Sequence, residues 1–119
     1  MAEDAAARAE IPAQRFFDVD IRVGRVISCA TFPEARTPAY RMDVDFGPLG
    51  VRQSSARLTD LYAAADLVGR LVIGVVNLPP RQIGPVRSEV LILGVYRHGG
   101  HEVVLLRPDA DCSPGDRIG

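Results

Sequence analysis

The residues of this sequence best suited to bind a ligand are arginines that lie beside prolines. The stretch from Asn77 to Ser88 holds three prolines, two arginines and a glutamine between two apolar segments. Proline fixes the backbone angle φ, so Pro79, Pro80 and Pro85 would hold the neighbouring polar side chains in place before a partner arrives. This composition predicts a stiff recognition loop. The alternative is an ordinary rigid connection with solvated arginines.

A second loop of the same design lies between Phe32 and Tyr40 and carries Arg36 between two prolines. Arginine suits phosphate and planar groups better than lysine does. If the partner is RNA, arginines would contact phosphates and riboses, and amide and hydroxyl groups would add hydrogen bonds. The candidate ligand-binding residues are Arg36, Arg41, Ser54, Asn77, Arg81, Gln82, Arg87 and Ser88. For Asn77, a strand-end cap of its own loop is an equally good interpretation.

The aromatic content bears on the kind of nucleic acid. Single-strand binders stack bases on exposed aromatic side chains. This chain has no tryptophan, four phenylalanines and three tyrosines, and we expect the core to need most of them. Any RNA would therefore be recognised by its folded shape.

No arrangement of residues in the sequence predicts catalysis. His98 and His101 flank a Gly-Gly pair without a third ligand, so hairpin polarity explains them better than a metal site. Ser54 and Ser55 lie outside any nucleophile-elbow motif. Neither a P-loop nor a G-x-G-x-x-G motif occurs, and the two cysteines form no C-x-x-C pair, so we expect free thiols. The sequence predicts a protein without enzymatic activity, cofactor or metal.

Charge is distributed unevenly along the chain. The net charge of the 119 residues is −1, yet residues 21–100 hold ten arginines and six acidic residues. A mildly basic middle suits a local phosphate-binding face and falls short of nonspecific duplex binding. No segment has the length and apolar character of a membrane span, and residues 1–10 are acidic and alanine-rich, unlike a signal peptide. These features predict a cytoplasmic protein.

The elements that would position the two loops are mainly strands. Residues 41–46 alternate apolar and polar side chains, residues 51–56 form the return strand of a hairpin, and residues 71–76 and 90–96 are further strands. A change of apolar phase at Gly24 predicts a bulge or a sharp bend in the strand of residues 20–27. Residues 59–68 predict a short helix or pair of turns, and a Gly-Gly turn leads to a last strand at residues 103–106.

This order predicts an all-β protein with the OB-fold, a five-stranded Greek-key barrel with a short helical connection and small terminal extensions. Residues 1–15 would be a flexible N-terminal extension, with a short helix near Pro12–Phe17, and residues 16–119 would form one domain. An OB-fold binds ligands with the loops joining strands 1 and 2 and strands 4 and 5. Here these are residues 32–40 and 78–87, the two arginine loops.

Six segments of the sequence together resemble the CsaA proteins, a family of tRNA-binding-domain proteins described as export-related chaperones. The segments begin at Asp20, Phe32, Asp45, Ser54, Asn77 and Ser88, and the resemblance extends from about Phe16 to Gly119. It implies a homodimer that binds unfolded or exported polypeptides and the protein-export ATPase SecA. The wider family includes tRNA-binding domains, in which a glycine and a methionine follow the serine equivalent to Ser88 after one residue. This chain has Ser88-Glu-Val-Leu instead, which places it on the CsaA branch and leaves structure-specific tRNA binding as the alternative function.

Apolar residues beside the loops suggest a surface for a polypeptide. Leu78, Ile83 and Val86 would form it, next to sheet edges that could pair with an extended chain. The same residues could instead form a dimer interface, and edge strands that need covering favour the dimer.

Overall fold

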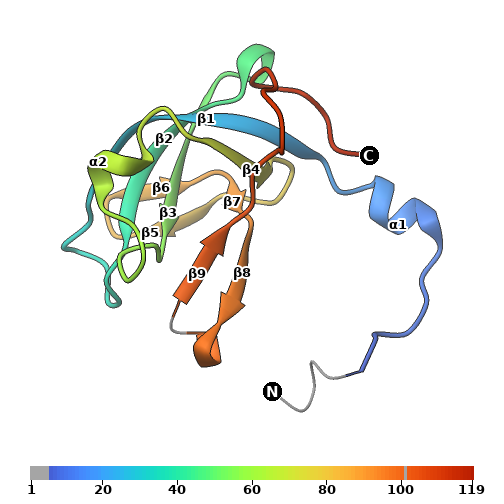
Figure 1. The fold of residues 1–119 in the computed structure, drawn as a ribbon, viewed down its shortest axis with the longest axis horizontal. Coiled ribbons are helices and arrows are strands. Elements are labelled where there is room, and N and C mark those ends of the chain that lie inside the picture. Colours follow the sequence, from blue (N-terminus) through green and yellow to red (C-terminus); the bar gives the residue numbers. More distant parts are fainter. Residues whose placement is uncertain (1–5, 101) are drawn as a thin grey trace.

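Five strands form an almost closed antiparallel barrel, which is the body of the protein (Figure 1). The structure is a computed structural model that describes residues 6–100 and 102–119. The barrel strands are β1 (Ile21–Thr31), β2 (Tyr40–Asp45), β3 (Val51–Ala56), β4 (Leu71–Val75) and β7 (Leu91–Ile92), in the order β3-β2-β1-β4-β7. The predicted OB-fold is confirmed. The residues of the predicted extension that precede residue 6 lie outside the described residues.

The barrel interior is filled from strands that alternate as expected. Met42 and Val44 on β2 are fully buried, and Phe46 follows them into the same core. Two glycines make room for the Phe46 ring, because a Cβ on Gly24 would lie 2.7 Å from it and one on Gly74 would lie 3.0 Å from it. Gly24 therefore faces inward for reasons of space.

Of the two alternatives predicted at Gly24, a bulge or a sharp bend, the bulge is wrong. The register between β1 and β2 shifts between Val26 and Ser28, which places the irregularity at Ile27. The change of phase at Gly24 has another cause: Val23, paired with Ile73 of β4, points to the outside of the sheet and is nevertheless buried. Both faces of the first half of β1 are covered, as in a strand within a larger core.

The outer cover is the C-terminal segment, residues 112–118. It runs beside the start of β1 (Figure 1), where the amide of Val23 donates to the carbonyl of Asp116 at 2.9 Å and the amide of Gly115 to that of Val23 at 2.8 Å. Arg22 and Arg117 form an antiparallel bridge. The chain end thus adds a short extended segment to the free edge of β1.

Two small hairpins extend the barrel. The first pairs β5 (Arg81–Ile83) with β6 (Val86–Ser88), so part of the predicted stiff loop is a hairpin with its turn at Gly84. The second pairs β8 (Gly94–Arg97) with β9 (Glu102–Leu105) and projects from the barrel (Figure 1). The predicted strand of residues 90–96 is thus interrupted at Leu93. Both glycines of the predicted Gly-Gly turn have positive φ and lie within η3 (His98–Gly100). His101 lies outside the described residues.

Three further short helical elements complete the fold of the described residues. They are α1 (Ala13–Phe17), η2 (Gly47–Leu49) and α2 (Ala64–Leu67). The connection before β4 is therefore one short helix preceded by turns, and α2 contributes Leu67 to the core. α1 begins after Pro12, as predicted, but none of its residues is buried.

Candidate functional site

The two arginine loops meet in a small apolar cluster that is separate from the barrel core. Phe32 and Ala39 from the first loop and Val86 from the β5–β6 hairpin are buried together, and Ala35 and Ile83 pack against them. A Cβ on Gly84, at the tip of the hairpin, would lie 3.6 Å from the Cβ of Glu34. Loops separated by about fifty residues of chain are therefore in contact, as the OB-fold topology predicts.

The burial of Val86 overturns one prediction. Val86 has no exposed area, so it is part of the loop cluster and forms no surface for a polypeptide. Ile83 is half-buried against the same cluster, and only Leu78 is well exposed, at 47%. Periodicity could not reveal this, because the apolar partners of Val86 come from a distant loop.

The four candidate arginines are all exposed: Arg36, Arg41, Arg81 and Arg87. None of them forms an ion pair with a carboxylate of residues 6–100 or 102–119. Their guanidinium groups are thus available for phosphate or carboxylate groups of a partner.

Strand pairing places some of these arginines in one row. Arg41 on β2 pairs with Ser55 on β3, the amide of Ser55 donates to the hydroxyl of Ser88 at 3.4 Å, and Ser88 on β6 pairs with Arg81 on β5. Arg87 pairs with Gln82, one step along the hairpin, so these two lie on the face opposite to Arg81. The structure therefore aligns Arg41 with Arg81 and directs Arg87 to the other side of the hairpin.

The predicted polar ligands are engaged within the protein. Asn77 accepts from the amide of Asp20 at 2.8 Å and donates to the carbonyl of Asp18 at 2.8 Å, which ties the N-terminal arm to the end of β4. Gln82 donates to the carbonyl of Gly84 at 2.7 Å within the hairpin turn. Asn77 is thus engaged at the end of β4, but with the N-terminal arm and not, as the alternative interpretation predicted, with its own loop.

Ser54 is placed in the core and is unavailable to a ligand. It is 1% exposed, and its hydroxyl donates to the carbonyl of Val90 at 3.3 Å. Two hydrogen bonds adjoin this one. The amide of Glu89 donates to the carbonyl of Gln53 at 2.8 Å, and the amide of Gln53 donates to the carboxylate of Glu89 at 3.2 Å. The prediction of Ser54 as a ligand-binding residue is wrong, because its hydroxyl helps to close the barrel.

The pKa values of one carboxyl group and one thiol are shifted, and both groups lie outside the two loops. A hydrogen bond from Arg22, 2.6 Å away, lowers the pKa of Asp20. Burial raises the pKa of the Cys29 thiol, which keeps it protonated and unreactive. Neither group gives the arginine loops acid–base chemistry.

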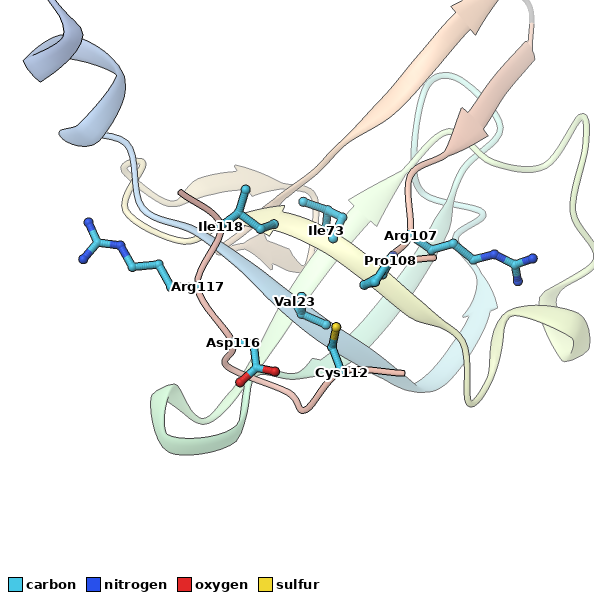
Figure 2. Close-up of a pocket in the computed structure, with 8 residues that line it drawn as sticks. All are labelled: Val23, Ile73, Arg107, Pro108, Cys112, Asp116, Arg117 and Ile118. Atoms are coloured by element: carbon cyan, nitrogen blue, oxygen red, sulfur yellow. The ribbon is translucent and has the colours of Figure 1, made fainter. Parts of the chain in front are cut away.

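A groove on another side of the barrel also carries no reactive pair (Figure 2). Val23, Ile73 and Ile118 line it, and the sulfur of Cys112 points toward Val23. Arg107 and Arg117 lie at opposite ends and point away from each other. In the described part of the chain, no group of three or more His, Cys, Asp or Glu side chains is arranged to hold a metal ion, and no helix there is long and apolar enough to cross a membrane.

Sequence reasoning missed an apolar surface away from the arginine loops. Tyr96 is 76% exposed and Val95 is 50% exposed, on opposite faces of the β8–β9 hairpin, and Leu91 lies exposed just before it. Phe16 and Phe17 of α1 are also exposed and contact each other edge to face. Most of the aromatic residues do pack in a core cluster, as expected, namely Phe32, Tyr40, Phe46 and Tyr62, and these three are the exceptions. The adjacent apolar pair Val95-Tyr96, which must place one side chain on each face of a strand, was the available signal.

Comparisons with known proteins agree with this fold. Residues 21–117 match the sequence model of the family described as "Putative tRNA binding domain". The chaperone CsaA from Bacillus anthracis is 41% identical, with a TM-score of 0.88 over 93% of this chain and 100% of that one. The CsaA chaperone protein from Picrophilus torridus is also 41% identical, with a TM-score of 0.85 over 92% of this chain and all of that one.

More distant relatives are parts of longer proteins. The methionine–tRNA ligase of Thiobacillus denitrificans is 33% identical over 98% of this chain, which spans 18% of the ligase. That of Porphyromonas gingivalis is 36% identical, and the chain spans 17% of its length.

Proposed function

The chain belongs to the family of putative tRNA-binding domains and is of the CsaA type, and on this premise we propose that it is a non-enzymatic chaperone for unfolded or exported polypeptides. The observation that carries the proposal is the 41% identity to two proteins called CsaA chaperones, over their full lengths. An export role would bring the protein to precursor chains and to SecA in the cytoplasm.

The proposed polypeptide site is the outer edge of β5. Within the described residues β5 pairs only with β6, so its other edge has backbone groups that an extended chain could pair with. Exposed Leu78 precedes this strand and half-buried Ile83 ends it, which supplies apolar contacts for alternate side chains of the client. Pairing through the backbone would tolerate many client sequences, as a chaperone requires.

The protein is proposed to act as a homodimer through the β8–β9 hairpin. A short hairpin with exposed apolar side chains on both faces is poorly stabilised by its own chain. A second copy could cover Val95 and Tyr96 and pair with the free edges. Sedimentation at micromolar concentration should show twice the 12.9 kDa chain, and a monomer under these conditions would refute the dimer.

Structure-specific tRNA binding is the second candidate function. The family model favours it, as do four exposed arginines that form no ion pairs with described carboxylates. Arg36, Arg41, Arg81 and Arg87 would contact phosphates on a folded RNA. The polypeptide and RNA sites would then adjoin, with different residues carrying each.

The two functions separate in one titration series on the wild-type protein. Binding of a folded tRNA and of an unfolded precursor is measured side by side at salt concentrations from about 50 to about 200 mM, where counterion release dominates the salt dependence of RNA binding. The chaperone proposal predicts precursor binding that changes little with salt, because apolar contacts and strand pairing carry it. It fails if the precursor does not bind. The RNA proposal predicts a log–log salt slope of about −3, from about four phosphate contacts.

A further inference from the structure

We propose that Phe32 is a positioning residue for the RNA site, because the loop cluster around it fixes the two arginine loops relative to one another. This inference rests on the proposed binding of RNA by the four arginines. Phe32 follows the end of β1 and is only 3% exposed, although it lies in a connecting loop. Connecting loops are ordinarily exposed and mobile, so a buried phenylalanine there requires an explanation.

The packing partners of Phe32 indicate what it holds. Ala35 and Ala39 belong to its own loop, and Ile83 and Val86 belong to the β5–β6 hairpin. The cluster contains no buried residue of the barrel core. Its apolar contacts therefore join loop to loop, and the barrel core does not depend on them.

Arg36 is placed by this arrangement. The amide of Phe32 donates to the carbonyl of Ala39 at 3.1 Å, and the amide of Ala35 donates to the carbonyl of Phe32 at 3.2 Å. Arg36 follows directly on that closed turn. On the other side, Arg81 lies on the same hairpin face as Ile83 and Val86, the two side chains that the cluster holds.

A shared anchor changes how the arginines bind. When two cationic groups are held at a fixed separation, the second contact costs less ordering entropy than it would on an independent loop. If the anchor is removed, Arg36 must be ordered separately for each binding event, at a cost that offsets what its phosphate contact contributes, so the contact is no longer made and its counterion release is lost. Phe32 thus contributes to RNA affinity without contacting RNA.

The test is a double-mutant cycle on tRNA binding with Phe32→Ala, Arg36→Ala and the combined variant. Positioning predicts that Phe32→Ala weakens tRNA binding about as much as Arg36→Ala, and that each flattens the salt slope by about one unit, the contribution of one phosphate contact. The combined variant should then be no weaker than Arg36→Ala alone, because interacting sites are not additive. Additive losses, or an unchanged slope in Phe32→Ala, would overturn the proposal.

Two further variants separate positioning from general stability. Leu67→Ala removes a fully buried side chain of the barrel core, so it should lower the unfolding temperature and leave the salt slope unchanged where the protein is still folded. Phe32→Leu keeps an apolar anchor and should retain the wild-type slope. If Phe32→Ala does not fold, Val86→Ala weakens the same cluster from the hairpin side and should flatten the slope in its place; an unchanged slope there overturns the proposal. Absence of tRNA binding by the wild type would refute the RNA function itself, a separate outcome.

Discussion

The two small hairpins have the same architecture and opposite distributions of polarity. In β5–β6, the apolar residues Ile83 and Val86 turn toward the first arginine loop, and the exposed positions are polar. In β8–β9, Val95 and Tyr96 are exposed on opposite faces. The first hairpin is held by its own chain and presents charge, whereas the second presents apolar surface that its own chain leaves uncovered. The difference favours partner contacts through charged side chains and free backbone groups at the first hairpin, and through apolar side chains at the second.

The largest expected effect comes from placing a charge in the apolar hairpin. Val95→Asp should convert the dimer into a monomer, because a carboxylate would be buried without a partner in the proposed interface. We expect the dimer dissociation constant to rise at least about a hundredfold, roughly the effect of losing an interface hot spot. Sedimentation equilibrium measures it. The hairpin has no such role if the variant stays dimeric.

The second prediction compares the stability of the two hairpins. Val86→Ala removes methyl groups from a fully buried position and should lower the free energy of unfolding by about 1–3 kcal/mol, whereas the matched Val95→Ala at a half-exposed position should change monomer stability by less than about 0.5 kcal/mol. Urea denaturation of the wild type and of both variants, all at protein concentrations below the dimer dissociation constant, provides the measurement. Equal losses in the free energy of unfolding would mean that the rest of the chain stabilises the two hairpins to the same extent.

Strand alternation predicted the barrel but could not predict how its outer surface is covered. Met42, Val44 and Phe46 alternate cleanly because solvent lies on one side of β2. Val23 broke the pattern because the C-terminal segment, about ninety residues later, pairs with the edge of β1 and places side chains such as Ile118 beside Val23. The burial of Val86 has the same kind of cause, a partner distant in sequence.

The candidate site was predicted at the level of loops and only partly at the level of side chains. Proline and arginine content identified both loops, since local composition determines stiffness and charge. The polar side chains could not be assigned in this way. Asn77 and Ser54 bond to backbone groups that tertiary folding brings to them.

A smaller effect is expected at the junction of the N-terminal arm with β1. The pKa of Asp20 in the folded protein lies below its ordinary value of 3.8, so the Asp20–Arg22 pair stabilises the fold fully above that value. The contribution is lost as the pH falls through the lower folded pKa. Asp20→Asn should therefore remove part of the acid dependence of the unfolding temperature below about pH 4 and leave both hairpin surfaces unaffected. An unchanged acid limb would contradict the assigned role of the pair.

The smallest effect is expected at the tip of the apolar hairpin. His98 lies 3.4 Å from the carboxylate of Glu102 and is well exposed. Replacing His98 and His101 together by alanine should leave tRNA and polypeptide binding within about twofold of the wild type, since exposed pairs of this kind contribute little. A large loss of binding with the fold preserved, measured by circular dichroism, would show that the histidines have a function.

The most direct test of the division of the surface is the salt dependence of the Arg36→Ala, Arg81→Ala double variant. Its tRNA salt slope should flatten by about two units, from about −3 to about −1, because two phosphate contacts are lost. Binding of an unfolded precursor should remain near the wild-type level, since apolar contacts and strand pairing at β5 would carry it. If precursor binding fell as far as tRNA binding while the dimer stayed folded, the arginines would serve both ligands and the division of the surface would be wrong.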